Sequence, residues 1–187
     1  MKTSFLTDLT CSNCNKSFSA EEVQTFCPSC NAPLISNYDL NAVREHVDRD
    51  EITKRNKGMW RWHELLPVRE PENIVTLGEG DAATLHLPRV GNALGLSNLF
   101  VKDESTNPTG SFKARGLSAA VSKAKEFGIK KVIIPTAGNA GGAMAAYAAR
   151  AGMESLIYMP KDTPSANIIE SRIVGSEVIL VDGLISD

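Results

Sequence analysis

Lys113 lies in the run Lys102–Gly116, which reads KDESTNPTGSFKARG, and its amine could carry out covalent chemistry. Turn-forming residues precede it, and Ser111 or Thr109 could cap a helix that begins beside the lysine. In a first helical turn the positive end of the helix dipole disfavours an ammonium ion. Condensation with an aldehyde requires a neutral amine, so this lysine is a candidate nucleophile, although a solvated lysine explains the same position.

The loop Thr136–Gly142, which reads TAGNAGG, is the second candidate. Its glycines leave backbone N–H groups open at the start of a predicted helix, which suits an anion. Asn139 adds an amide that can donate a hydrogen bond to a ring oxygen or a carboxylate. A tight turn with small residues for packing is the alternative. The loop does not match G-x-G-x-x-G, so a dinucleotide site is disfavoured.

The four cysteines form two Cys-x2-Cys pairs separated by twelve residues: Cys11, Cys14, Cys27 and Cys30. Two thiolates at this spacing suit neighbouring corners of a tetrahedral metal site. We predict a structural zinc ribbon, whose four thiolates leave no open position for catalysis. Two disulfides or a redox dithiol are the alternatives. The missing signal-peptide pattern argues against the first, and the lack of an adjacent βαβ unit argues against the second.

The charge balance bears on possible partners. The chain has 20 Lys and Arg against 22 Asp and Glu, a formal net charge of −2, and residues 1–40 are also acidic. A phosphate backbone requires the opposite sign, so no nucleic-acid partner is predicted for the ribbon. No stretch approaches the roughly 20 apolar residues of a membrane span. Asp8 interrupts the N-terminus before any hydrophobic run, so we expect a cytoplasmic protein without a membrane partner.

The elements that must position both loops alternate along the chain. The pattern predicts strands at 98–102, 131–135, 155–159 and 177–181, and helices at about 112–127, 142–150 and 166–174. This alternation predicts an α/β fold with an open, mostly parallel sheet, in which strand 131–135 is buried on both faces. Ligands bind at the carboxyl ends of such strands, where both loops lie.

A charged and aromatic stretch, from Tyr38 to about Val68, precedes this region and contains both tryptophans. It could dock its aromatic side chains on the main domain, or form a short helix that packs on its neighbours. His46 and His63 are expected to be surface or packing residues. We therefore predict three regions: a zinc-ribbon-like leader at 1–40, a helical and aromatic connecting segment at 41–75, and an α/β region at 76–187.

These motifs together resemble those of the fold-type II pyridoxal-phosphate enzymes. Lys102–Gly116 is similar to their lysine motif, and Thr136–Gly141 is similar to their asparagine loop. Within that group, the cysteine leader, the MWRW and LLP motifs at 59–67, and LGEG at 77–80 most resemble the threonine synthases. The resemblance runs from about Cys11 onward and implies that group's parallel sheet, present here in incomplete form.

The resemblance also implies roles for the matching residues. Lys113 would bond to pyridoxal 5'-phosphate and later move protons, Asn139 would hydrogen-bond the ring hydroxyl, and Phe112 would pack against the cofactor. Backbone groups of one loop would hold the substrate carboxylate: Thr136, Ala137, Gly138, Asn139, Ala140 and Gly141. The implied reaction of this carbon–oxygen lyase converts O-phospho-L-homoserine, a phosphorylated amino acid, and water to L-threonine and phosphate.

The chain departs from the family pattern at two places. Asp81–Leu85 stands where the family has a Thr-Pro-Leu segment that borders the substrate, which leaves a sibling such as cysteate synthase as an alternative. The family's phosphate loop and pyridine-nitrogen partner lie in a second half that this chain lacks. We therefore expect an N-terminal part, nearly inactive alone, with a complementing C-terminal half or a homo-oligomeric state. A non-catalytic docking or regulatory role is a further alternative.

Overall fold

The computed structural model describes residues 4–186, which form two compact units. Unit 1 comprises the chain up to Ile74 together with Ser122–Ile129. Unit 2 comprises Val75–Val121 together with the chain from Lys130 onward. Helix α4 (Lys113–Glu126) therefore contributes residues to both units. None of the helices described is long and apolar enough to cross a membrane.

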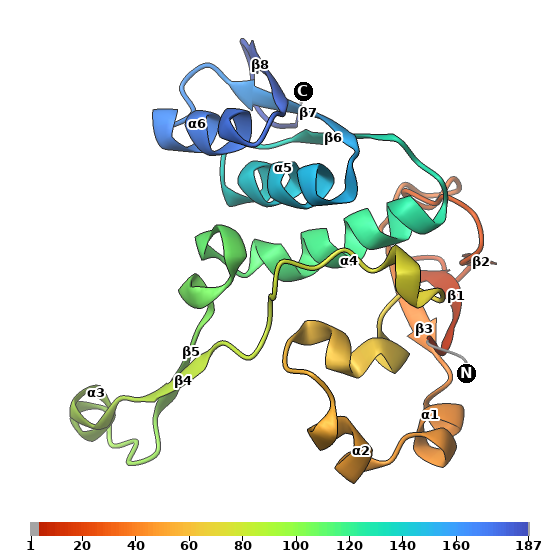
Figure 1. The fold of residues 1–187 in the computed structure, drawn as a ribbon, viewed down its shortest axis with the longest axis vertical. Helices are drawn as coiled ribbons and strands as arrows, with labels where there is room; N and C mark the ends of the chain where they lie inside the picture. The colour runs from red at the N-terminus through yellow and green to blue at the C-terminus, as the bar shows by residue number, and fades with distance from the viewer. Residues whose placement is uncertain (1–3, 187) are drawn as a thin grey trace. The chain divides into compact units, whose positions relative to one another are not determined.

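Unit 1 begins with a three-stranded antiparallel sheet in the order β2-β1-β3, and two short helices follow it (Figure 1). Its elements are β1 (Leu6–Cys11), β2 (Ser17–Ser19), β3 (Leu34–Tyr38), α1 (Leu40–His46) and α2 (Arg49–Lys54). Both helices start at an aspartate whose carboxylate accepts a backbone N–H two or three residues later, at Asp39 and Asp48. These N-caps explain why such short helices have defined starts.

The connecting segment of unit 1 forms a short 3-10 helix at Met59–Leu65, the second of the two structures that the sequence allowed. Glu64 within it is only 6% exposed, while Trp62 is 50% exposed. Arg55 makes a two-pronged ion pair with the Glu64 carboxylate, at 2.9 Å from Nη1 to Oε2 and 2.7 Å from Nη2 to Oε1. This buried ion pair connects the end of α2 to the 3-10 helix.

Unit 2 contains a three-stranded parallel sheet in the order β6-β7-β8 and a separate antiparallel pair, β4 with β5. Its further elements are β4 (Ala83–His86), α3 (Pro88–Ala93), β5 (Phe100–Asp103), β6 (Lys131–Pro135), α5 (Asn139–Ala151), β7 (Glu154–Pro160), α6 (Ser165–Ile173) and β8 (Glu177–Val181). Helices α5 and α6 lie on one face of the parallel sheet (Figure 1). The core between them is built on Ala145, Ile157 and Met159.

The α/β class and the three later strands are confirmed, but the prediction for the first strand was wrong. Residues 98–102 were expected to join the parallel sheet. The strand instead covers Phe100–Asp103 and pairs antiparallel with β4, from Ala83 opposite Asp103 to His86 opposite Phe100. A short apolar run indicates a strand without indicating its partner, and here the partner is the segment that precedes it along the chain.

The expectation that β6 is buried on both faces was also wrong. Its residues alternate in exposure, and Ile133 is 58% exposed. The cause is that α5 and α6 cover only one face of the sheet among the residues described. The other face borders a hollow of about 610 Å³ lined by apolar side chains that include Ile133, Tyr158 and Leu184.

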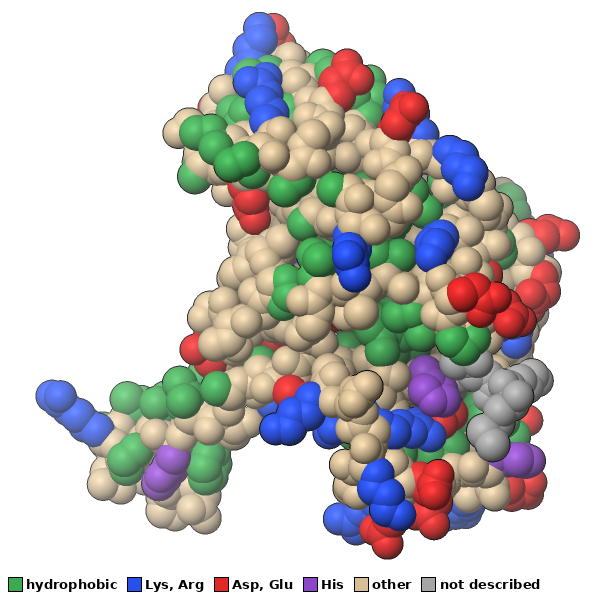
Figure 2. Space-filling model, viewed as in Figure 1, with side chains coloured by type: hydrophobic (Ala, Val, Ile, Leu, Met, Phe, Trp, Pro, Cys, Tyr) green, Lys and Arg blue, Asp and Glu red, His purple; other side chains and the backbone are tan. Residues whose placement is uncertain are grey.

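A second apolar surface lies on β4, α3 and β5, where Figure 2 shows hydrophobic side chains at the surface. Six side chains between 41% and 64% exposed belong to it: Leu85, Val90, Leu94, Leu96, Phe100 and Val101. Successive strand residues face opposite sides, so these side chains lie on both faces of the β4–β5 pair. So many exposed apolar side chains together are typical of a segment that another polypeptide covers. Unit 2 therefore presents two uncovered apolar surfaces.

We expect Arg55→Met to destabilise unit 1 by about 2–4 kcal/mol at neutral pH, because a nearly buried carboxylate loses its partner. Burial is the largest influence on the pKa of Glu64 and pushes it upward, but the Arg55 hydrogen bonds, a backbone N–H and the nearby charges of His63 and Arg55 together hold this pKa below its ordinary value of 4.5. The contribution of Glu64 to stability is thus present above pH 4.5 and is lost as pH falls through the lowered pKa.

Without Arg55, the largest influence that lowers this pKa is lost while burial remains, so the pKa of Glu64 rises and protonation of Glu64 relieves the variant in acid. The stability difference between wild type and Arg55→Met should therefore shrink between about pH 7 and pH 4. Urea unfolding at both pH values measures it. Lys54→Met, an exposed site on the same helix, serves as the control. A pH-independent difference would contradict this account.

Candidate functional site

Lys113 is the first residue of α4. The Ser111 hydroxyl oxygen accepts a hydrogen bond from the Lys113 backbone N–H (3.3 Å), which confirms the cap predicted at this helix start. The lysine side chain is half-buried, and its Nζ lies 4.5 Å from the centre of the Phe112 ring. That ring is 57% exposed. The amine therefore lies against an aromatic surface that is open to a further planar group.

The turn before the lysine is held by its own polar groups. Asn107 Oδ1 accepts the backbone N–H of Gly80 (2.9 Å), and Asn107 Nδ2 donates to Glu104 Oε2 (2.7 Å). Thr109 adopts the left-handed conformation, with φ at 59°. A β-branched residue in that region persists only where its surroundings impose the conformation, so this turn is tightly constrained.

Arg115, two residues after the lysine, is also part of this network. Its guanidinium donates two hydrogen bonds to the Glu104 carboxylate, at 2.7 and 2.9 Å. These bonds lower the pKa of Glu104, so the carboxylate stays ionised near neutral pH. The arginine therefore stabilises the turn that carries Lys113.

The second loop lies between β6 and α5. The helix begins at Asn139, three residues earlier than the sequence predicted, and Gly138 stands at its N-cap position. The Thr136 backbone N–H donates to the Tyr158 carbonyl (2.9 Å), which extends the β6–β7 pairing into the loop. The Thr136 hydroxyl then accepts the Gly138 N–H (3.2 Å). Asn139 thus stands in the first turn of α5, next to the carboxyl end of β6.

Close packing accounts for two of the loop's glycines. A Cβ at Gly141 would lie 2.9 Å from both Thr136 Cγ2 and Met159 Cε, and one at Gly142 would lie 2.2 Å from the carboxyl carbon of Glu170. The helix start therefore approaches the sheet and α6 more closely than any larger residue allows. The packing role and the anion-binding role proposed for these glycines are compatible.

Asn167 supports the same loop and was not predicted. It lies in the first turn of α6, and its Nδ2 donates to the Ala137 carbonyl (3.1 Å). The two residues are 30 positions apart, so no local pattern indicates the contact. The one signal in the sequence is the residue type itself, because asparagine is disfavoured inside helices and this one stands in the first turn of a helix.

The structure places the turn before Lys113 against helix α5 within unit 2. The turn at Pro108–Gly110, just before Lys113, contacts α5, whose first residue is Asn139 (Figure 1). The site therefore combines a primary amine, an aromatic ring, an amide and the open backbone N–H groups of a helix start. Such a set can hold a planar anionic molecule beside a nucleophilic nitrogen.

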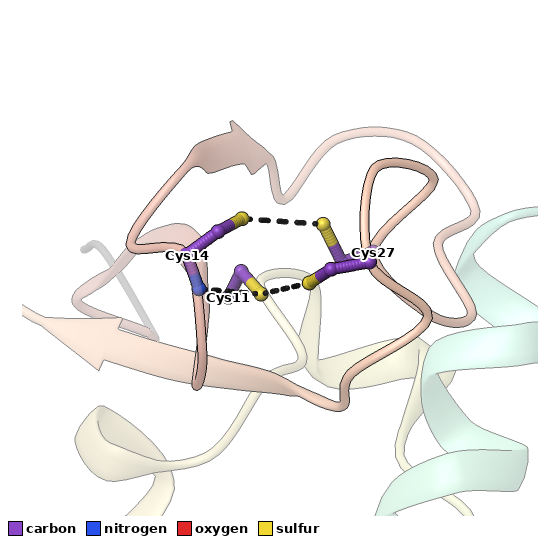
Figure 3. A group of neighbouring side chains, drawn as sticks. Cys11, Cys14 and Cys27 are labelled. Carbon is purple, nitrogen blue, oxygen red and sulfur yellow. Dashed lines mark hydrogen bonds between the residues drawn. The ribbon is translucent and has the colours of Figure 1, made fainter.

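The four cysteines form a separate cluster in unit 1 (Figure 3). Their Sγ atoms all lie within 4.8 Å of one another, and the closest approaches are 3.4 Å for Cys11 to Cys30 and 3.6 Å for Cys14 to Cys27. Zinc–sulfur bonds of ~2.3 Å in a tetrahedron give sulfur separations of about 3.8 Å. The donor set and its spacing therefore suit a tetrahedral metal ion.

Local backbone geometry shapes this cluster. Each Cys-x2-Cys pair is followed by an asparagine in the left-handed conformation, Asn15 at φ 59° and Asn31 at φ 57°. Asparagine tolerates that region better than other non-glycine residues do, which explains its position after each pair. The backbone N–H groups of Cys14 and Asn13 donate to Cys11 Sγ, at 3.4 Å each, and lower the pKa of the Cys11 thiol to about 6.

His46 and His63, predicted to be surface or packing residues, border the same cavity in unit 1. This cavity of about 510 Å³ is also lined by Phe5 and the buried Glu64. His46 Nδ1 is hydrogen-bonded to the Ala42 carbonyl (2.8 Å). No sequence pattern connected the two histidines, because α1 and the 3-10 helix meet only in the folded unit.

Residues 75–187 match the family model described as pyridoxal-phosphate dependent enzyme. This match covers more than half of the chain and includes both loops of the candidate site. The chain belongs to the pyridoxal-phosphate dependent enzyme family.

Several relatives define the similarity more closely. The chain is 33% identical over 178 residues to the threonine synthase of Methanocaldococcus jannaschii, covering 95% of this chain and 44% of that protein. It is 41% identical over 124 residues to the threonine synthase of Synechocystis sp., covering 65% of this chain and 32% of that protein. The chain thus spans less than half the length of these relatives.

A solved structure supports the fold. The apo form of diaminopropionate ammonia lyase from Escherichia coli superposes with a TM-score of 0.55 at 23% identity, over 60% of this chain and 36% of that chain. At this identity the likeness concerns the fold alone. It agrees with an α/β unit that holds part of a larger parallel sheet.

Replacement of Gly141 by alanine should destabilise unit 2 by about 1–3 kcal/mol, because the new methyl group overpacks the contact with the sheet. The methyls of Thr136 and Ile157 that it meets belong to β-branched side chains with little freedom to move. Gly142→Ala is the matched control, since its clash is with the end of the flexible Glu170 side chain. Thermal unfolding of both variants measures the difference, and an equal effect at the two sites would contradict this packing account.

Proposed function

We propose that this chain is the cofactor-lysine part of a threonine synthase-like enzyme, which converts O-phospho-L-homoserine and water to L-threonine and phosphate. One observation carries the proposal. A half-buried lysine at the start of α4 closely follows a turn that contacts α5, the helix that begins in the glycine-rich loop, inside the region that matches the pyridoxal-phosphate family. The names of the most similar relatives support the substrate class.

The residues present suit pyridoxal 5'-phosphate. The amine of Lys113 can bond to an aldehyde, and the exposed face of the Phe112 ring can stack on a planar pyridine. Asn139 can donate its amide to the ring hydroxyl. When bound, the cofactor supplies an electron sink that stabilises negative charge on the substrate.

The chain's own residues would bind and orient the substrate. Backbone N–H groups of Thr136–Gly141 would hold its carboxylate, because the start of α5 carries a partial positive charge. The Asn167 bond to the Ala137 carbonyl keeps this loop in place. The Lys113 amine, positioned by the turn before it, would accept and return the protons that the reaction moves.

We further propose that the cysteine cluster holds a structural zinc ion. Four sulfur ligands would complete a tetrahedral shell, so the ion would stabilise unit 1 without taking part in the reaction. The proposed substrate site lies in unit 2 and uses none of these cysteines. Metal and cofactor would thus act in different parts of the chain.

The rest of the active site would come from polypeptide beyond this chain. The relatives are more than twice as long as the segment matched here. The two uncovered apolar surfaces of unit 2 agree with a larger assembly, supplied by a complementing part or by another copy. We expect the chain alone to bind the cofactor weakly and to show little activity.

Borohydride labelling tests the cofactor assignment. With excess pyridoxal phosphate, reduction should fix the cofactor on Lys113, and peptide mass spectrometry should find this site labelled several-fold above other lysines. Lys113→Ala should lose that label, whereas Lys125→Ala on the same helix should keep it. Labelling spread evenly over the lysines would contradict the assignment.

Product analysis tests the substrate. A polypeptide that contains this chain together with the remaining part of the enzyme should release phosphate and threonine from O-phospho-L-homoserine. The same preparation with O-phospho-L-serine is the comparison. Faster turnover of O-phospho-L-serine would overturn the threonine synthase assignment while leaving the cofactor lysine intact.

Metal removal tests the ribbon. A strong chelator or Cys27→Ser should release about one zinc per chain and destabilise unit 1 by several kcal/mol, since the binding energy of a structural zinc is folding energy. Elemental analysis and thermal unfolding measure the two effects. Ser29→Ala, between the second pair of cysteines, is the control. A chain that contains no metal and keeps its stability in chelator would exclude this role.

A further inference from the structure

Glu79 is a carboxylate with no solvent exposure, placed in the LGEG motif to which the proposed function assigns no role. Its oxygens accept hydrogen bonds from the hydroxyls of Ser118 (2.5 Å), Tyr147 (2.6 Å) and Thr76 (3.1 Å), and from the backbone N–H of Leu77 (3.0 Å). Three of these partners, the Tyr147 and Thr76 hydroxyls and the Leu77 N–H, are donors that meet at Oε2. The Ser118 hydroxyl also lies 2.8 Å from the Val75 carbonyl, so its single proton is shared between that carbonyl and Glu79 Oε1. The donors at Oε2 favour an ionised carboxylate.

The charge state agrees with this geometry. Burial is the largest influence on the pKa of Glu79 and pushes it upward, but the hydrogen bonds from Ser118, Tyr147 and two backbone N–H groups together keep this pKa below its ordinary value. Burial and the adjacent carboxylate both raise the pKa of Tyr147, so its hydroxyl remains a donor. Glu79 is thus an ionised carboxylate held by several hydrogen bonds.

The partners of Glu79 belong to the two helices that carry the proposed site. Ser118 lies on α4 five residues after Lys113, and Tyr147 lies on α5 eight residues after Asn139. At 1.5 Å per residue, these anchors are about 7.5 and 12 Å along the helix axes from the site residues. Because helices are stiff over such lengths, the carboxylate that joins them also sets how their starts are placed.

The same segment reaches the lysine turn by a second route. Gly80, the next residue, donates its backbone N–H to Asn107 Oδ1 (2.9 Å). Asn107 in turn binds Glu104, which Arg115 holds by two hydrogen bonds. One short segment, Thr76–Gly80, therefore contacts α4, α5 and the turn before Lys113.

We propose that Glu79 is a positioning residue. It holds the starts of α4 and α5 in the relative placement that lets Lys113 and Asn139 contact the same bound molecule. This inference rests on the proposed function. It adds a residue that touches neither cofactor nor substrate and acts through Ser118 and Tyr147.

Two substitutions separate charge from length. Glu79→Gln removes the charge but can keep the bonds, because its NH₂ group can donate to the Ser118 hydroxyl while that hydroxyl donates to the Val75 carbonyl. Glu79→Asp keeps the charge but shortens the side chain by one methylene, so it cannot reach both helices. Tyr147→Phe removes one donor and leaves the carboxylate in place. It is the milder variant if the Glu79 variants fold poorly.

The experiment uses two readouts on each variant. Borohydride labelling with pyridoxal phosphate gives the rate at which Lys113 is modified. Hydrogen exchange on the cofactor-free protein gives the protection of the first turns of α4 and α5. Val178→Ala, which removes apolar contacts between β8 and the core, is the control for a general loss of stability.

We expect Glu79→Asp to slow labelling of Lys113 by about 10-fold or more, since a misplacement of ~1 Å can cost about 100-fold. Glu79→Gln, which can keep the bonds to both helices, should stay closer to wild type. Tyr147→Phe should give a smaller effect than Glu79→Asp, and these two changes combined should be less than additive, because they act on one bond. Exchange at both helix starts should rise in Glu79→Asp. In Val178→Ala, exchange at the starts of α4 and α5 should stay unchanged when the variants are compared at equal global stability.

Unchanged labelling and exchange in Glu79→Asp would overturn the inference, and so would equal changes in Val178→Ala. If wild type itself is not labelled at Lys113, the proposed function fails instead. The exchange measurement needs no cofactor and still decides whether Glu79 holds the two helix starts.

Discussion

A carboxylate buried among hydroxyl donors joins the three parts of unit 2 that matter for its chemistry. Ser118 and Tyr147 bring α4 and α5 to Glu79, and the segment around Glu79 also reaches the turn before Lys113. An unpaired charge in such a place would be very costly, so the donors must stay in position whenever the unit is folded. The geometry of the candidate site thus depends on an interaction that lies outside it.

The two units differ in what stabilises them and in what they leave exposed. Unit 1 combines a small sheet and short helices with a few buried apolar side chains, including Leu6 and Val68, and gathers four thiols in a cluster that suits a metal ion. Unit 2 has a compact core under α5 and α6 but leaves its other apolar surfaces uncovered. These features agree with the family relationship, in which the chain corresponds to less than half of its relatives.

Sequence patterns predicted the fold where local chemistry is sufficient. The β-branched runs at 131–135 and 177–181 became β6 and β8, because β-branched side chains fit the pleated, partly buried surface of a sheet. The first strand shows the limit. Its apolar run was recognised, yet its antiparallel pairing with β4 was not, since pairing depends on which other segment folds beside it. Burial of β6 was overestimated for the same reason, because coverage is a property of the whole layer.

The sequence by itself determined the reactive groups: the lysine before a helix, the glycine-rich loop with its asparagine, and the paired cysteines. Each is encoded within a few residues, where spacing and turn chemistry act directly. Only the tertiary structure decided what holds them. Glu79 meets Tyr147 across 68 positions, Asn167 meets Ala137 across 30, and His46 shares a cavity with His63. Such contacts join polar groups far apart in the chain, and hydrophobic packing of the helices and sheets, rather than any local preference, brings them within bonding distance.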